Sequence, residues 1–237
     1  MGRMRRETTD VTAAEVDLDT RRPRTTAAVV AVLLVTLGCA LGWWASVQGG
    51  PWPVDVWWNG VVSGHRVPAL LESARVLDLL GAGVVGVYVI PVGATLALTL
   101  SGRRWAAAYL LTTLVVSAVL VQVLKHVVGR ARPDGILVVV DEGSFPSGHT
   151  ANAATLAVVA AVLLPVLWVR VVGTVAVLLM ALSRTYLHAH WLSDTLGGVL
   201  LGSGVALLLA AAFWGPLARE RDVPEADTRG DGHRSPT

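Results

Sequence analysis

Three short polar segments interrupt a strongly apolar chain, and their side chains are of the types that hold and transfer phosphate groups. They are Lys125–Pro133 (KHVVGRARP), Phe145–His149 (FPSGH) and Ser183–Asp194 (SRTYLHAHWLSD). Lys125 is the only lysine, and arginine fills the other Lys/Arg positions. A position that needed only positive charge would be expected to carry arginine in this chain, so the lone lysine indicates that a compact ammonium is required.

The cations of these segments predict a phosphate-binding cradle. Arginine binds phosphate oxygens through a planar fork, lysine binds them as a point charge, and the N–H groups at a helix start add further donors. The segments supply Lys125, Arg132 and Arg184, and a helix expected to begin at Ser147-Gly148 supplies the N–H groups. Taken singly, such cations also reach from a membrane edge toward headgroups, and Ser147 is also a suitable N-cap. Their occurrence together favours the phosphate site.

Two histidines and one aspartate have the spacing of a nucleophile, its orienting group and a proton donor. His190 and Asp194 are four residues apart, so on a helical turn the carboxylate holds one imidazole N–H and leaves the other nitrogen free. This pair describes an activated nucleophile. His149 lies in a different segment, where it is suited to donate a proton to a leaving oxygen and later to take one from water.

His188 and His190 form an H-x-H pair, which raises the alternative of a metal site. On a helix the two side chains would point about 200° apart, and no further ligands follow at a zinc spacing. We therefore expect no metal and no other cofactor, and we interpret His188 as a structural residue or a neighbour of the catalytic groups. Asp141 and Glu142 are expected to lie solvated in a loop. The single cysteine, Cys39, excludes an intramolecular disulfide.

The composition indicates a membrane protein. Hydrophobic residues make up 54% of the chain, charged residues 15%, and the mean hydropathy is +0.60, which is too apolar for an ordinary soluble domain. Continuous apolar runs approach the roughly 20 residues that span hydrocarbon, and they lack the alternation of a transmembrane β-barrel. We predict an all-α polytopic membrane protein with about six transmembrane helices. The runs cover residues 27–47, 81–100, 105–124, 150–169, 171–182 and 195–214.

The fifth of these runs is the shortest, and it must take length from the polar segment that begins at Ser183. Residues 49–80 are expected to lie on the outer membrane surface, as a connector or as a lip that admits a lipid sideways. The polar tails, residues 1–26 and 218–237, are expected to be disordered. This leaves residues 27–217 as the transmembrane domain.

The distribution of arginine predicts the orientation. With the N-terminus inside, most arginines fall in cytoplasmic segments, as the positive-inside rule requires. Both termini are then expected to be cytoplasmic, and all three polar segments to face the outside of a cell membrane. The net charge of +2 follows from this topology and requires no nucleic-acid partner.

The three segments together resemble the signature of the type 2 phosphatidic acid phosphatase superfamily. The matching patterns are K-x6-R-P at Lys125–Pro133, P-S-G-H at Pro146–His149 and S-R-x5-H-x3-D at Ser183–Asp194. They occur in the family's order, and the resemblance extends over about residues 27–217, except for most of residues 49–80.

This resemblance implies a role for each matching residue. The phosphate ligands would be Lys125, Arg132, Ser147, the Gly148 amide and Arg184. His190, oriented by Asp194, would attack phosphorus and form a phosphohistidine. His149 would protonate the leaving group and then activate water. The family's chemistry needs no metal, because the cations stabilise the charge of the transition state.

The sequence therefore predicts a metal-independent phosphatase of membrane lipid phosphates or diphosphates, acting on the extracytoplasmic face. The substrate classes considered are phosphatidic acid, phosphatidylglycerol phosphate and undecaprenyl diphosphate. One alternative is a lipid phosphotransferase, in which an alcohol or a sugar replaces water. Another is a non-catalytic lipid-phosphate binder or transporter, because charges within a membrane also mark transport paths. The residues do not determine the lipid or the oligomeric state.

Overall fold

The computed structural model describes residues 2–82 and 84–222, with side chains over 23–81 and 84–221, and this part of the chain is helical with no strand. The elements are α1 (Gly2–Gln48), α2 (Pro53–Gly64), α3 (Pro68–Ala82), the π-helical turn η1 (Val85–Val89), α4 (Ile90–Leu100), α5 (Arg104–Val128), α6 (Gly148–Leu163), α7 (Leu167–Tyr186), α8 (Leu192–Ala212) and α9 (Trp214–Asp222). The predicted all-α fold is confirmed.

Five segments of the described chain are long and apolar enough to cross a membrane. They are Pro23–Gln48, Pro68–Leu100, Arg104–Val128, Leu167–Tyr186 and Leu192–Ala212. The sixth expected span is α6, which is apolar but has only 16 residues. Each α6 residue is buried or half-buried, because α6 packs against α3, α5, α7 and α8. A short helix suffices in this central position.

The boundary between the fourth and fifth spans differs from the prediction. We expected runs 150–169 and 171–182, but α6 ends at Leu163 and α7 begins at Leu167. Pro165 lies between them, and proline cannot continue a helix without losing a backbone hydrogen bond. The helix α7 also continues through Ser183 to Tyr186. The expectation that this span takes length from the polar segment is thus confirmed.

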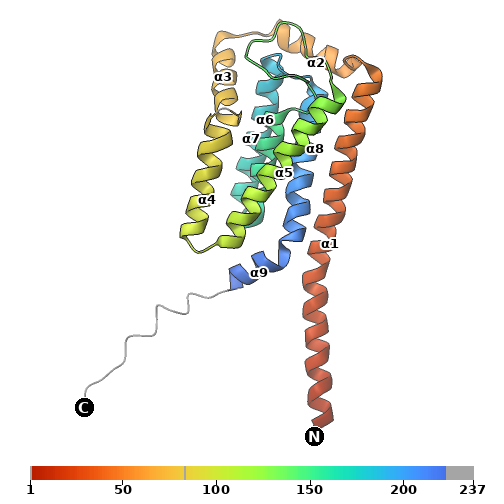
Figure 1. Cartoon of the computed structure of the whole chain (residues 1–237), viewed down its shortest axis with the longest axis vertical. Helices are drawn as coiled ribbons and strands as arrows, with labels where there is room; N and C mark the ends of the chain where they lie inside the picture. Colours follow the sequence, from red (N-terminus) through yellow and green to blue (C-terminus); the bar gives the residue numbers. More distant parts are fainter. Residues whose placement is uncertain (1, 83, 223–237) are drawn as a thin grey trace, which may run out of the picture.

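The segment 49–80 does not lie wholly on the surface. Only α2 crosses the end of the bundle, whereas α3 turns into the bundle and continues through η1 into α4 (Figure 1). Together α3, η1 and α4 form the span Pro68–Leu100. Gly86 lies in the π-helical turn, where a Cβ atom would come within 2.3 Å of the Leu80 carbonyl oxygen. Glycine therefore permits this irregular stretch.

The two tails also differ from the expected disorder within the described residues. The helix α1 begins at Gly2 and includes residues 2–22, whose arginine, alanine and glutamate residues are good helix formers. Residues 218–222 belong to α9, where the Glu220 carboxylate accepts hydrogen bonds from the N–H groups of Trp105 and Ala106 at 2.7 and 2.9 Å. Residues 223–237 lie outside the described residues. The domain boundaries stay a prediction.

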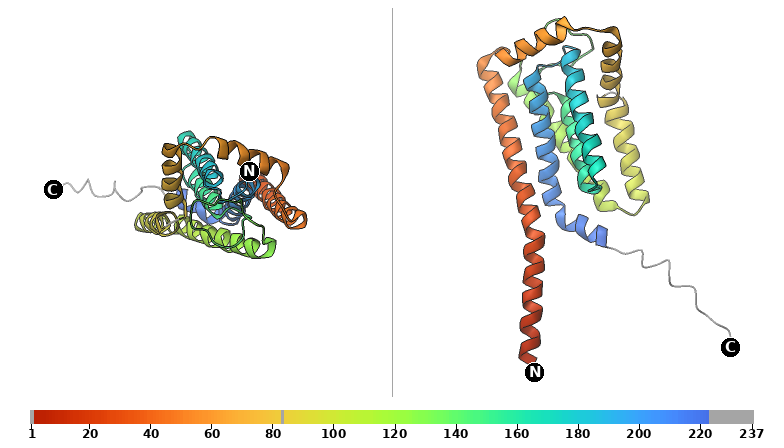
Figure 2. Two further views of the ribbon diagram at one scale, coloured as in Figure 1. Left: turned by 90° about the horizontal axis from the view of Figure 1, so that it is seen from above. Right: turned by 180° about the vertical axis from the view of Figure 1, so that it is seen from behind.

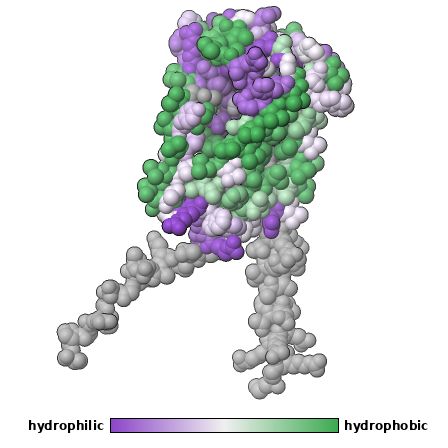
Figure 3. Space-filling model, in the orientation of Figure 1, coloured by the Kyte–Doolittle hydropathy of each residue, from purple (hydrophilic) through white to green (hydrophobic). Residues whose placement is uncertain are grey.

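The bundle has two different ends. The start of α1, the turn between α4 and α5, and α9 lie at one end, while α2 and the loops 129–147 and 187–191 lie at the other (Figures 1 and 2). Figure 3 shows a hydrophobic belt over α4 and α5, with hydrophilic residues concentrated beyond it. All three polar segments therefore meet at the α2 end.

Candidate active site

Lys125 lies in the last turn of α5 and is 4% exposed. Its Nζ atom donates to Oδ1 of Asp141 and to the carbonyl oxygen of Gly143, both at 3.0 Å. Gly143 has a φ of +72°, and a Cβ atom there would come within 2.8 Å of the Lys125 carbonyl oxygen. This close approach of the loop to α5 requires glycine. It holds the ammonium group of Lys125 at the α2 end of the bundle.

Arg132 extends from the loop after α5 toward the same carboxylate. Its Nη2 atom donates to Oδ1 of Asp141 at 2.8 Å, and its Nη1 atom donates to the carbonyl oxygen of Ala189 at 2.5 Å. Asp141 lies in the loop with its side chain 56% exposed, as expected, but it also pairs with both Lys125 and Arg132, which the sequence analysis missed. Burial alone raises the pKa of its carboxyl, but Lys125 and Arg132 outweigh burial and hold this pKa below its usual range.

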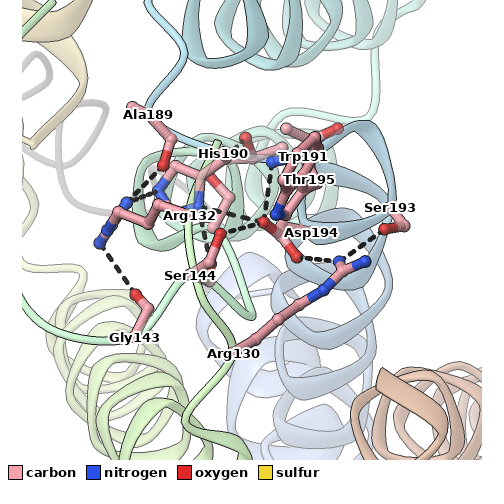
Figure 4. Close-up of polar contacts among 12 residues, drawn as sticks. Arg130, Arg132, Gly143, Ser144, Ala189, His190, Trp191, Ser193, Asp194 and Thr195 are labelled. Carbon is pink, nitrogen blue, oxygen red and sulfur yellow. Dashed lines mark hydrogen bonds and ion pairs between the residues drawn. The ribbon is translucent and has the colours of Figure 1, made fainter. Parts of the chain in front are cut away.

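His190 lies in the loop between α7 and α8, and it is buried. Its Nδ1 atom donates to the carbonyl oxygen of Ser144 at 2.7 Å, while its Nε2 atom lies 3.3 Å from Nη1 of Arg132 (Figure 4). Burial lowers the pKa of His190 to about 4, so the ring is neutral at pH 7. A neutral ring whose Nδ1 carries the hydrogen has a free electron pair on Nε2.

Asp194 orients His190 less directly than the sequence predicts. Its Oδ2 atom is 3.8 Å from Nδ1 of His190, which is too long for a hydrogen bond. Instead the carboxylate accepts hydrogen bonds from the hydroxyl of Ser144 and, at 2.8 Å, from the N–H of Trp191 (Figure 4). Asp194 therefore fixes the residue whose carbonyl group holds the imidazole.

Behind Asp194 lies a buried ion-pair network that the sequence analysis missed. The Arg130 guanidinium donates to Oδ1 of Asp194 at 2.5 Å and to Oδ2 of Asp55, on α2, at 2.7 Å. Ser193 donates to Asp55 from its N–H at 2.9 Å and from its hydroxyl at 2.7 Å. Both carboxylates are 0% exposed. The only sequence signal for Asp55 was a lone acidic residue among tryptophan and valine.

Ser147 and Gly148 begin α6 as predicted. The N–H of Ser147 donates to the carbonyl oxygen of Asp194 at 3.0 Å, and its hydroxyl lies 3.1 Å from that of Thr150. The side chain makes no cap hydrogen bond. Gly148 and His149 line a cavity, whereas Ser147 does not line it and is fully buried.

His149 and Arg184 meet a carboxylate that no motif contains. Nε2 of His149 lies 2.9 Å from Oδ1 of Asp78, on α3, and Nη1 of Arg184 pairs with the same oxygen. The sequence analysis missed this role of Asp78, because only the folding of α3 against α6 and α7 brings it to the site. Arg184 is 1% exposed, and its Nε atom has no hydrogen-bond partner among the described residues.

A cavity of about 580 Å³ connects this polar cluster to the membrane-spanning part of the bundle. Lys125, Asp141, Gly148, His149, Arg184 and His190 line its polar part. Arg132, Ser147 and Asp194 are not among its lining residues, although Nη1 of Arg132 lies 3.3 Å from Nε2 of His190. The remainder lies between η1, α4, α5 and α6, and its apolar lining includes Val87, Pro91, Val92, Leu111, Leu114, Val115, Ala118 and Val121.

His188 makes structural contacts. Its Nδ1 atom donates to the carbonyl oxygen of Asp134 at 2.9 Å. Its Nε2 atom lies 3.0 Å from Nη2 of Arg66 and 3.1 Å from the hydroxyl of Ser63. His188 therefore ties the end of α2 to the loop after α5. Among residues 2–82 and 84–222, no three metal-ligating side chains of His, Cys, Asp or Glu form a cluster.

Comparisons with known proteins identify the family. The model of the PAP2 superfamily matches residues 106–216, the range that contains all three polar segments. The chain is also 35% identical over 149 residues to decaprenylphosphoryl-5-phosphoribose phosphatase of Mycobacterium tuberculosis, covering 60% of this chain and 80% of that protein. The chain belongs to the PAP2 superfamily.

Other PAP2 relatives differ in the lipid they are named for. Lipid A 1-phosphatase of Rhizobium etli is 32% identical over 123 residues, which is 46% of this chain and 51% of that protein. The chain thus spans about half the length of the first curated relatives it matches. A crystal structure of a transmembrane PAP2 type phosphatidylglycerolphosphate phosphatase from Bacillus subtilis superposes with a TM-score of 0.67 at 27% identity, covering 78% of this chain and 96% of that one.

Proposed function

We propose that this PAP2 protein hydrolyses a lipid phosphate or diphosphate through a phosphohistidine on His190, with its active site on the extracytoplasmic face. The observation that carries this proposal is the cavity. Its polar part contains cations and the Nε2 side of a neutral histidine, and its apolar part lies between membrane-spanning helices. A phosphate headgroup and a lipid chain fit these two parts by their chemistry.

The substrate phosphate would be held by Lys125, Arg132, Arg184 and the N–H groups at the start of α6. Asp141 already lies between Lys125 and Arg132, which demonstrates that these cations can share one anion. Phosphate oxygens would take the place of this carboxylate. The unpartnered Nε atom of Arg184 would supply a further donor.

In the first step, the electron pair on Nε2 of His190 attacks phosphorus. The N–P bond forms, and the bond from phosphorus to the leaving oxygen breaks. That oxygen belongs to the lipid alcohol in a lipid phosphate and is the bridging oxygen in a lipid diphosphate, and His149 donates a proton to it. The carbonyl group of Ser144 holds Nδ1–H at 2.7 Å, so the positive charge that develops on the ring is stabilised as it forms.

In the second step, His149 takes a proton from a water molecule, whose oxygen attacks the phosphorus. The N–P bond breaks, inorganic phosphate leaves, and Nε2 of His190 regains its electron pair. Because the surrounding cations stabilise the transferring phosphoryl group, each step draws its catalysis from electrostatic preorganisation and positioning. The proposal requires no metal ion for either step.

The substrate class is a phosphate or diphosphate attached to a membrane lipid. This proposal is supported by the apolar lining of the cavity and by the names of the relatives, which include phosphatidylglycerophosphatase B of Bacillus subtilis and undecaprenyl-diphosphatase of Sulfolobus acidocaldarius. The extracytoplasmic location is supported by the arginines, which concentrate at the end of the bundle opposite the site.

The test is phosphate release by the purified full-length protein in detergent, with a chelator present. Phosphatidic acid, phosphatidylglycerol phosphate and undecaprenyl diphosphate are offered in parallel. We expect release from at least one of them, and loss of that release in His190→Ala but not in His126→Ala, an exposed histidine at the same end. No release from any of the three would refute the proposal, and a phosphorylated acceptor in place of free phosphate would indicate a transferase.

A further inference from the structure

Asp78 is an acidic side chain outside every sequence motif that contacts both the proposed proton donor, His149, and a proposed phosphate ligand, Arg184. Its Oδ1 atom lies 2.9 Å from Nε2 of His149 and also pairs with Nη1 of Arg184. Asp78 is 25% exposed on its side chain, compared with 2% for Arg184. A single carboxylate oxygen thus joins a histidine of α6 to an arginine of α7.

The position of Asp78 is fixed by contacts on both sides of it along α3. Four residues before it, the carbonyl oxygen of Ala74 accepts a hydrogen bond from Ser183 at 2.9 Å. Three residues after it, the carbonyl oxygen of Gly81 accepts one from Nδ2 of Asn152, also at 2.9 Å. These partners belong to α7 and α6, so the helices that carry Arg184 and His149 also hold α3 in place.

Gly81 brings this part of α3 close to His149. A Cβ atom at Gly81 would come within 2.2 Å of Cε of Met180 and within 3.3 Å of Cδ2 of His149. A larger residue would therefore require the end of the Met180 side chain to move and would crowd the His149 ring. The same nitrogen of Asn152 also donates to the carbonyl oxygen of Gly86 at 3.2 Å, which ties down the start of the irregular turn.

The carboxylate of Asp78 decides which nitrogen of His149 carries out proton transfer. A carboxylate accepts hydrogen bonds and cannot donate them, so a hydrogen must lie on Nε2 of His149. Nδ1 has no hydrogen-bond partner among the described residues, and His149 lines the cavity. Nδ1 is therefore the nitrogen available to give a proton to the lipid oxygen and to take one from water.

We propose that Asp78 is a positioning residue that orients His149 for proton transfer through Nδ1 and aligns Arg184 beside the phosphate. This inference rests on the proposed function. Asp78 itself neither gains nor loses a proton: the proton moves from Nδ1 of His149 to the leaving oxygen, and one from water restores it. The negative charge of Asp78 favours the protonated form of His149. The same charge opposes the binding of an anion, such as the substrate phosphate, close to it.

These two effects of the charge have opposite signs, and Asp78→Asn separates them. Turnover of a lipid phosphate, whose alkoxide leaving group needs a proton, is expected to fall at least about 100-fold, the lower end of what general acid catalysis contributes. The rate of the first release of p-nitrophenol from p-nitrophenyl phosphate, measured in a single turnover before water attacks, is expected to fall less than about tenfold, because this leaving group needs little protonation. Inhibition by orthovanadate is expected to be as strong as in the wild type or stronger.

The control is Glu72→Gln, the same kind of change on an exposed residue of the same helix. Glu72→Gln should leave the rates with both substrates, and the inhibition by vanadate, unchanged. Asp78→Glu, which keeps the charge, should recover part of the lipid turnover. Equal losses for both substrates, or weaker vanadate inhibition in Asp78→Asn, would instead indicate a purely structural role and overturn the inference. A wild type that releases no phosphate would overturn the proposed function itself, so the two failures are distinguishable.

Discussion

His190 donates its Nδ1 hydrogen to the main-chain carbonyl oxygen of Ser144 at 2.7 Å. The proposed nucleophile is thus oriented by the backbone, and Asp194 acts one contact away, through the Ser144 hydroxyl. The local sequence explains this arrangement, because Ser144 precedes Phe145-Pro146 and the start of α6, and its carbonyl group is directed toward the loop that carries His190.

Ser144→Ala should reduce turnover less than Asp194→Ala does. The carbonyl acceptor of His190 remains, and Asp194 keeps its bonds to the N–H of Trp191 and to Arg130. Loss of a hydrogen bond to a charged group costs about 1.5–3 kcal/mol, so steady-state kinetics should give a decrease of roughly 10- to 150-fold. Asp194→Ala should decrease turnover far more, because it also leaves Arg130 without one of its two carboxylates. Equal losses in the two variants would show that the hydroxyl is the main orienting contact.

Arg130→Met should destabilise the protein strongly. Arg130 pairs with Asp55 and Asp194, which are both 0% exposed, and removal of one partner from a buried ion pair typically costs about 3–5 kcal/mol. The matched control is Arg75→Met, which breaks an exposed pair with Glu72 and should change stability by less than about 1 kcal/mol. Thermal unfolding in detergent measures both. Similar melting temperatures for the two variants would contradict the account.

His190 should remain neutral well below the pH at which an exposed histidine titrates. Burial lowers its pKa from 6.5 to about 4, and the nearby Asp194 carboxylate only partly opposes this. As the pH falls from about 6.5 toward 4, the unfolded chain binds a proton that the folded protein does not, so this residue lowers stability in that window. NMR titration of the substrate-free protein, with His190 assigned from a His190→Gln variant, should show no titration near pH 6.5. A midpoint there would contradict the burial argument.

Ala118→Phe should discriminate between lipid and soluble substrates. Ala118 lines the apolar part of the cavity, where a phenyl ring would occupy the space proposed for the lipid chain. We expect KM for a long-chain lipid phosphate to rise about tenfold or more, a loss of about 1.4 kcal/mol of binding, with little change for p-nitrophenyl phosphate. The neighbouring Val119→Phe, at a position 57% exposed on the outside of α5, is the control. Equal effects of the two variants would argue against the proposal that the lipid chain lies in this part of the cavity.

The sequence predicted the parts of the site that lie close together along the chain. His190 and Asp194, or Ser147 and His149, are separated by fewer than five residues, so a spacing rule is enough to relate them. Apolar runs likewise predicted the spans, and the errors fell at helix boundaries. At Pro165, for example, the chain stays apolar, but the proline separates α6 from α7. Direct contact between His190 and Asp194 was expected from helical spacing, but His190 lies in a loop before α8.

Asp55 and Asp78 were not predictable from spacing. Asp55 pairs with Arg130 across 75 residues of sequence, and Asp78 pairs with Arg184 across 106. Both contacts depend on how α2 covers the end of the bundle and how α3 turns into it. Asp141 was close enough in sequence to be noticed, but its role depends on the left-handed Gly143 that brings the loop against Lys125. Such contacts follow from tertiary packing.

The most direct test of the central claim is to trap the phosphoryl group on the protein. His149→Ala is mixed with radiolabelled p-nitrophenyl phosphate, whose leaving group needs little help from an acid, and the reaction is quenched in base, in which phosphohistidine is stable. Because the variant lacks the residue that activates water, we predict covalent label that is lost on acidification and that maps to His190. His149→Ala combined with His190→Ala should carry no label. Label of the same kind in this double variant, or none in His149→Ala while p-nitrophenol is released, would contradict the assignment of His190 as the nucleophile.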